Sequence, residues 1–290
     1  MIELWQKFKG GDMPQILVYF CKIAFKPQRT IEQELSKIDF KKAIQIVVDP
    51  DVKVTPRYNR TWRFSQPKII DEFLVGKFGF VSSGVEQVGD YDDKIKDFFV
   101  KDMDSKKPTI SFWAIDLSSQ IMAFEVKPPD IKYQSFISNF KSFLNEKPDI
   151  NLGLERVIET AKFIEWVENV DRVTKFTATL RPPNPNYSKH PQILSELLEE
   201  TNADQATVEF TKQKGACDSL NTEKDKTIQK LVDYGKVGYS IIVARGIKKN
   251  KTKIYDSRKR TPLETIEIPK GIDDDSRWGR IIDSIRSFIK

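Results

Sequence analysis

The stretch TISFWAIDLSSQIMAFEVKPPD, from Thr109 to Asp130, constrains the fold of this chain more than any other. Residues 109–116 and 120–127 are apolar and rich in β-branched and aromatic types, and Leu117-Ser118-Ser119 separates them. Two such runs joined by a short polar turn predict a pair of antiparallel strands. Trp113 and Phe124 lie on facing strands of this hairpin, so we expect both in the core.

An apolar stripe follows the hairpin at helical spacing. Its members are Tyr133, Phe136, Ile137, Phe140 and Leu144. The stripe predicts a helix that packs on the hairpin sheet, because aromatic stripes of this kind are usually core.

The rest of the chain alternates irregularly between strand and helix patterns. Strands are predicted at residues 15–25, briefly within 76–88, and at 171–180, 205–213 and on both sides of the turn at 248–251. Helices are predicted from Thr30 to residue 48, at 154–168, at 190–203, at 221–235 with Gly235 as the glycine after the C-terminus, and at 273–290. Residues 92–103 fit either a helix or an extended segment. The pattern predicts an α+β fold with antiparallel hairpins, divided into an N-terminal domain (1–150) and a C-terminal domain (151–290).

Scarce residue types exclude several classes of protein. The chain has two cysteines, Cys21 and Cys217, and one histidine, His190. These numbers exclude a disulfide framework and zinc sites built on several histidines. We expect no cofactor and no metal. No apolar run approaches the roughly 20 residues that span a bilayer, so we expect a soluble cytoplasmic protein without a membrane span.

Positive charge is concentrated in RGIKKNKTKIYDSRKR, residues 245–260. This window holds eight basic residues and one acid, a net charge of +7 in a chain whose total is +6. Such concentration is typical of a polyanion contact. The candidate nucleic-acid-binding residues are Arg245, Lys248, Lys249, Lys251, Lys253, Arg258, Lys259 and Arg260, with Arg277 and Arg280 of the last helix as an extension. The alternatives are a solvated ribbon edge and a docking site for an acidic protein.

The hairpin also contains a loose nuclease-like pattern, Asp116 followed by Glu125-Val126-Lys127. Carboxylates that share a metal ion must lie within about 5 Å of each other. In a simple hairpin Asp116 is opposite Ile121 and Glu125 is opposite Phe112, which separates the two acids by roughly 13 Å. The alternative catalytic set is Asp104, Glu125 and Lys127, which requires Asp104 to fold back toward Glu125.

A second open choice concerns Arg181 and the proline-rich loop after it. This loop is either a nucleic-acid contact or a stiff connection.

Several segments together resemble phage exclusion proteins of the Rex A type and uncharacterised prokaryotic proteins found with anti-phage systems. They are GFVSSGVEQV, SFWAIDLSSQIMAFEVKPP with the apolar helix after it, FTATLRPPNP and KQKGACDSLN, within residues 75–245. The resemblance implies a two-domain α+β protein that dimerises and binds DNA without strong sequence preference. It also implies a role as sensor or effector in phage exclusion beside a partner protein, and it supplies no catalytic residues.

We therefore expect a non-catalytic protein of anti-phage defence that binds nucleic acid, in the first place double-stranded DNA, as a homodimer. The first alternative is a Mg²⁺-dependent nuclease. The second is a protein-interaction subunit of a defence complex.

Overall fold

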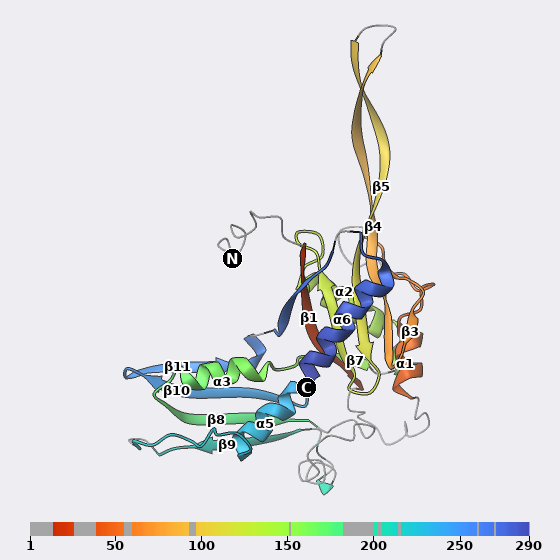
Figure 1. The fold of residues 1–290 in the computed structure, drawn as a ribbon. Coiled ribbons are helices and arrows are strands. Elements are labelled where there is room, and N and C mark those ends of the chain that lie inside the picture. The colour runs from red at the N-terminus through yellow and green to blue at the C-terminus, as the bar shows by residue number, and fades with distance from the viewer. Residues whose placement is uncertain are drawn as a thin grey trace.

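The structure is a computed structural model. It describes residues 14–25, 39–54, 60–92, 97–150, 152–181, 200–201, 203, 205–213, 216–259, 261–269 and 271–289. Side chains are described for all of these except 82–107 and Pro148. The fold is α+β, as the sequence predicts, and its strands form two antiparallel sheets (Figure 1).

The first sheet has eight strands in the order β12-β1-β6-β5-β4-β2, with β3 paired to β4 and β7 paired to β1. Its strands are β1 (Gln15–Phe25), β2 (Trp62–Phe64), β3 (Lys68–Ile70), β4 (Phe73–Asp92), β5 (Asp97–Asp116), β6 (Ile121–Val126), β7 (Leu152–Glu155) and β12 (Leu263–Glu267). The predicted hairpin is its centre, because β5 pairs with β6 and Trp113 lies opposite Phe124. The predicted register is confirmed, since it places Phe112 opposite Glu125.

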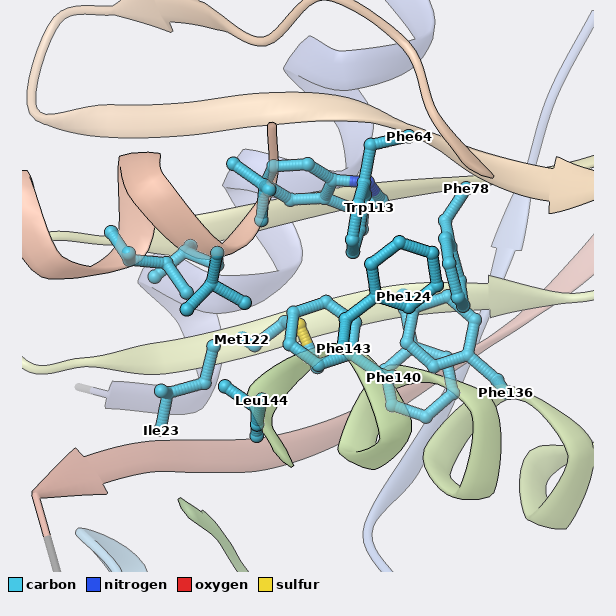
Figure 2. Close-up of a cluster of buried hydrophobic side chains, with 14 of the residues drawn as sticks. Ile23, Phe64, Phe78, Trp113, Met122, Phe124, Phe136, Phe140, Phe143 and Leu144 are labelled. Carbon is cyan, nitrogen blue, oxygen red and sulfur yellow. The ribbon is translucent and has the colours of Figure 1, made fainter. Parts of the chain in front are cut away.

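Helices α1 (Phe40–Val47) and α2 (Tyr133–Asn145) pack against one face of this sheet. Figure 2 shows Phe136, Phe140 and Phe143 of α2 gathered near Phe124 of the hairpin, while Trp113 lies beside Phe64. The rings of Phe124 and Phe136 stack with centroids 3.9 Å apart. The predicted stripe is therefore core, and Trp113 and Phe124 are fully buried, as expected.

Helix α6 (Asp274–Ile289) covers the opposite face of the first sheet. Trp278 of this helix packs on Phe112 and donates a hydrogen bond from Nε1 to the backbone oxygen of Gly76 at 3.1 Å. Strand β6 is thus covered on both faces, and all six of its residues are buried. This double burial explains why the segment reads as a near-continuous apolar run rather than an alternating one.

The second sheet has four strands in the order β11-β10-β8-β9. They are β8 (Arg172–Leu180), β9 (Ala206–Thr211), β10 (Ser240–Lys248) and β11 (Lys251–Asp256). Helices α3 (Thr160–Glu168) and α5 (Thr227–Lys236) pack on one face, where Phe163, Phe176, Leu231 and Tyr255 form a separate core. Two short 3₁₀ helices, η3 (Pro148–Ile150) and η4 (Ser257–Lys259), complete the described elements.

The predicted division at residue 150 does not coincide with the division between the sheets. Strand β7 pairs with β1, and β12 pairs with the other side of β1. The chain therefore leaves the first sheet after β7, builds the second sheet, and returns to the first through β12 and α6 (Figure 1). The second sheet is an insertion joined to the first by two connections, at residues 156–159 and 257–262.

Strands β4 and β5 extend far beyond the first sheet as a two-stranded arm (Figure 1). Their pairing continues without interruption from Phe73 opposite Asp116 to Asp92 opposite Asp97. Strand β2 accompanies β4 only as far as Phe80. The arm proper, residues 81–92 and 97–108, is roughly 40 Å long at about 3.4 Å per residue. The prediction of a short strand here was wrong, and residues 97–103 are strand rather than helix.

Two helix predictions also need correction. The helix predicted from Leu154 begins at Thr160, because Leu154 belongs to β7. Gly235 lies inside α5, and the left-handed glycine that follows this helix is Gly238, at φ 80°. The segment from Thr30 to residue 38 and the helix predicted at 190–203, except its last residues, fall outside the described residues. Among the described residues, no helix is both long and apolar enough to cross a membrane.

Candidate nucleic-acid interface

The concentrated positive charge lies on a tight hairpin formed by β10 and β11, here called the basic ribbon. Lys248 pairs with Lys251, and only Lys249 and Asn250 lie between them. Both turn residues have positive φ, 48° and 61°. Two successive residues with left-handed backbone form a type I′ turn, whose twist matches the twist of the two strands that it joins. The predicted pair of strands around KKNK is confirmed.

The turn is held against the loop between α3 and β8. The backbone nitrogen of Lys249 donates to Oδ2 of Asp171 at 2.7 Å, and the Asp171 nitrogen donates to the oxygen of Ile247 at 2.7 Å. At Gly246 the register with β8 shifts, and an added Cβ would lie 3.0 Å from the backbone oxygen of Arg172. Glycine permits this close approach, so the ribbon is a fixed part of the second sheet.

Strand alternation places cations on both faces of the ribbon. Tyr255 is buried against Phe163 and Trp166 of α3, so its face is the one that the helices cover. Lys251 and Lys253 alternate with Ile254 and therefore share the face of Tyr255, beyond the end of the helical layer. This confirms that the two lysines lie together, as predicted.

Arg245 lies on the opposite, open face. It pairs with Ile254 on one side and with Lys175 of β8 on the other. Arg245 is exposed to solvent, and 58% of the surface of Ile254 is also exposed. Lys175 was not predicted as a candidate, because only the pairing of β8 with β10 brings it beside Arg245. Its ammonium lies 2.7 Å from a Glu209 carboxylate oxygen, so part of its charge is already neutralised.

At the base of the ribbon, Arg258 is neutralised by an acidic neighbour. Arg258 donates two hydrogen bonds to the Asp256 carboxylate, from Nε at 2.9 Å and from Nη2 at 2.8 Å. This pairing holds the pKa of Asp256 below its ordinary value and raises the pKa of Arg258. Lys259 is exposed in η4, and Arg260 lies outside the described residues.

The last helix does not extend the patch as predicted. Arg277 lies on α6 against the first sheet, where its guanidinium is ion-paired to the buried carboxylate of Glu125. The same guanidinium lies 4.6 Å from the centroid of the Phe112 ring. Arg280 is exposed on the same helix, which packs on a different sheet from the ribbon (Figure 1). The structure thus separates Arg277 and Arg280 from the basic ribbon, because α6 returns to the first sheet.

The nuclease-like residues are not brought together either. The Asp116 carboxylate accepts hydrogen bonds from the backbone and side chain of Ser118 and from Ser119, so it closes the turn. Asp104 lies in the arm opposite Val85, eight residues along β5 from Phe112, which is roughly 27 Å at about 3.4 Å per residue. The expectation that Asp104 could join Glu125 and Lys127 is therefore wrong.

Glu125 is fully buried between two cations. Arg277 pairs with it, and Lys127 Nζ lies 3.9 Å from Oε1. Burial lowers the pKa of Lys127, and the charge of Glu125 opposes that effect. Within the part of the chain that the structure describes, no three Asp, Glu, His or Cys side chains cluster as metal ligands. The cluster is an internal ion-pair arrangement that fixes α6 on the sheet.

The remaining candidate from the sequence, the loop after β8, is described only at its start. Arg181 forms an ion pair with Glu155 of β7, so it joins the two sheets. Tyr187, Lys189 and His190 lie outside the described residues.

One known family model matches most of this chain. That model, a domain of unknown function named DUF4747, matches residues 34–282, which include the second sheet, the basic ribbon and every strand of the first sheet except β1. The chain belongs to the DUF4747 family. No curated protein and no solved structure matches the chain.

Proposed function

We propose that this DUF4747 protein binds double-stranded DNA through the basic ribbon, by contacts to the phosphate backbone. One observation carries the proposal. Among the described residues, no carboxylate lies within ion-pair distance of the exposed or half-buried cations at the ribbon's outer end. These cations are Arg245, Lys248, Lys249, Lys251 and Lys253.

Some cations elsewhere on the surface have an acidic partner. Lys77 pairs with Asp274, and Lys212 pairs with Asp218. The ribbon concentrates like charges without such partners, and like charges at this density repel one another. A polyanion relieves this repulsion, and its binding is favoured by release of counterions from the phosphates.

The geometry of the ribbon favours a duplex groove. Its cations lie on both faces and at the turn, with Lys251 and Lys253 on one side and Arg245 on the other. The major groove of DNA, about 12 Å wide, admits a two-stranded ribbon. A ribbon in that position would present each face to one phosphate-lined wall. Contacts of this kind give affinity without strong sequence preference.

The cellular role follows from the resemblance to phage exclusion proteins. We propose that the chain acts in the cytoplasm as a homodimeric sensor or effector of anti-phage defence, beside a partner protein. The second candidate is docking of an acidic protein, which the same cations would favour. A nuclease activity is not proposed, because the residues that would supply it lie far apart.

Charge reversal tests the proposal. The ribbon variant changes Lys248, Lys249, Lys251 and Lys253 to Glu. A matched control changes four exposed lysines outside the ribbon in the same way, namely Lys41, Lys42, Lys132 and Lys224. Fluorescence anisotropy with a labelled duplex at about 100 mM salt should show loss of binding for the ribbon variant alone. Equal affinity of both variants would remove the ribbon from the interface.

The same assay separates the alternatives. Single-stranded DNA and double-stranded RNA should compete more weakly than duplex DNA, because neither offers a wide major groove. If the wild-type chain fails to bind any nucleic acid, docking of an acidic protein becomes the better account of the ribbon.

A further inference from the structure

A cavity of about 340 Å³ lies where the two connections between the sheets pass each other. Arg156, Val157 and Ile158 of the outgoing connection line it, and Ser257 and Arg258 of the returning connection lie on its other side. This volume falls within the range of small-ligand sites, about 300–1,000 Å³, and junctions between structural units are a common place for them. The cavity is separate from the outer end of the basic ribbon.

The lining carries an excess of positive charge. Four cations surround the cavity, namely Lys141 of α2, Arg156, Arg181 and Arg258, against one acid, Glu155. Glu155 is already ion-paired with Arg181. Among the described residues, Lys141 and Arg156 have no carboxylate within ion-pair distance. Both are exposed at the cavity and can reach an anion there.

Apolar side chains supply another part of the wall, beside the hydroxyls of Thr179, Ser240 and Ser257. Leu154 and Val157 lie on the side of the first sheet, and Ile241 lies on the side of the second. A mixed lining of this kind suits a ligand with an apolar or aromatic body and an anionic group. Arginine in particular matches phosphate, because its planar guanidinium donates two parallel hydrogen bonds.

The cavity is bounded by a contact that fixes the sheets relative to each other. Lys22 of β1 donates a hydrogen bond from Nζ to the backbone oxygen of Val237 at 2.8 Å. Its aliphatic stem packs on Gly238, which lines the cavity with φ 80°. A Cβ added at position 238 would lie 2.8 Å from Cδ of Lys22, so any larger residue there would meet this stem. The wall is therefore formed before a ligand arrives.

We propose that this cavity binds a small organic phosphate of nucleotide size. Arg156 and Lys141 would hold the phosphate, because Arg181 and Arg258 are already paired with Glu155 and Asp256. Leu154, Val157 and Ile241 would contact the organic part. The site is independent of DNA binding by the ribbon, and either could exist without the other.

Isothermal titration of the full chain with AMP, ADP, ribose 5-phosphate, inorganic phosphate and adenosine tests the proposal. We expect at least one organic phosphate to bind at one site per chain, at least 10-fold more tightly than inorganic phosphate or adenosine. The variant Arg156→Ala with Lys141→Ala should weaken that binding at least 10-fold. Both side chains are exposed, so the variant should fold, and urea unfolding with the same midpoint as the wild type would verify this.

The ribbon variant with four Lys→Glu changes serves as the control and should bind the organic phosphate as the wild type does. Three results would overturn the proposal. The first is no binding of any organic phosphate at millimolar concentration. The second is equal affinity for inorganic phosphate, which would mean that the apolar wall takes no part. The third is loss of binding in the ribbon variant but not in the cavity variant, which would place the anion on the ribbon.

Discussion

Lys22 predicts a distinctive dependence of stability on pH. Its side chain is fully buried between the sheets, with Nζ 3.4 Å from the centroid of the Tyr239 ring. Burial lowers the pKa of this ammonium from 10.5 to about 6, while the charge of Glu155 acts in the opposite direction. The Tyr239 ring also favours the charged form, so desolvation must outweigh two opposing interactions.

The sign of the effect follows from proton linkage. Between pH 6 and pH 10.5 the unfolded chain holds a proton on Lys22 that the folded chain has lost, so the free energy of unfolding rises with pH. Each pH unit in this window contributes about 1.4 kcal/mol. Between pH 7 and pH 9 the contribution is therefore about 2.7 kcal/mol. Below pH 6 both states are protonated and the full cost of burial remains.

The variant Lys22→Met isolates this contribution, because methionine has a similar length and no charge. Urea unfolding, followed by tryptophan fluorescence, gives the difference in free energy of unfolding between wild type and variant at each pH. We expect this difference to shift in favour of the wild type by about 2.7 kcal/mol from pH 7 to pH 9. Loss of the hydrogen bond to Val237 changes the free energy of unfolding of the variant by the same amount at every pH. Lys41→Met, at an exposed position, should give a flat difference. A flat difference for Lys22→Met as well would refute the reasoning and mean that the ammonium stays charged in the fold.

Further predictions concern the core, the buried ion pair and the arm. Trp113→Ala should lower the free energy of unfolding by about 3–5 kcal/mol, since Trp113 is fully buried in the first core, and chemical denaturation measures this. Glu125→Gln should cost about 3 kcal/mol, because it leaves the Arg277 charge without its partner, yet duplex affinity of the folded variant should not change. Replacing residues 84–105 by an Asn-Gly turn should convert a dimer to a monomer in light scattering, since a two-stranded ribbon alone in water is marginal and a second copy would support it. A monomeric wild type would contradict that last expectation.

Local patterns predicted those parts of the fold in which neighbours in sequence are also neighbours in space. The register of Trp113 with Phe124 follows from a short turn between two apolar runs, and the ribbon around Lys249 follows from a short turn between two strand patterns. The stripe on α2 was likewise visible, because helical spacing is a property of one segment.

Contacts between distant segments were not visible in the sequence. Strand β7 is four residues long and is defined by its pairing with β1, more than a hundred residues earlier. The arm has glycines and many charged residues, which are typical of loops, yet its two strands pair throughout. Arg277 looked available for DNA because its partner Glu125 lies 152 positions away. The cavity between the sheets depends on the same kind of long-range contact, so no local signal marked it.

The salt dependence of DNA affinity tests the central claim most directly. Each phosphate neutralised on duplex DNA contributes about 0.9 to the slope of log affinity against log salt concentration. If each of Lys248, Lys249, Lys251 and Lys253 contacts one phosphate, their replacement by Ala should reduce the slope by about 3–4. The same change at Lys41, Lys42, Lys132 and Lys224 should leave the slope at the wild-type value. A ribbon variant with the wild-type slope would contradict the account, because the ribbon would then contribute no phosphate contacts.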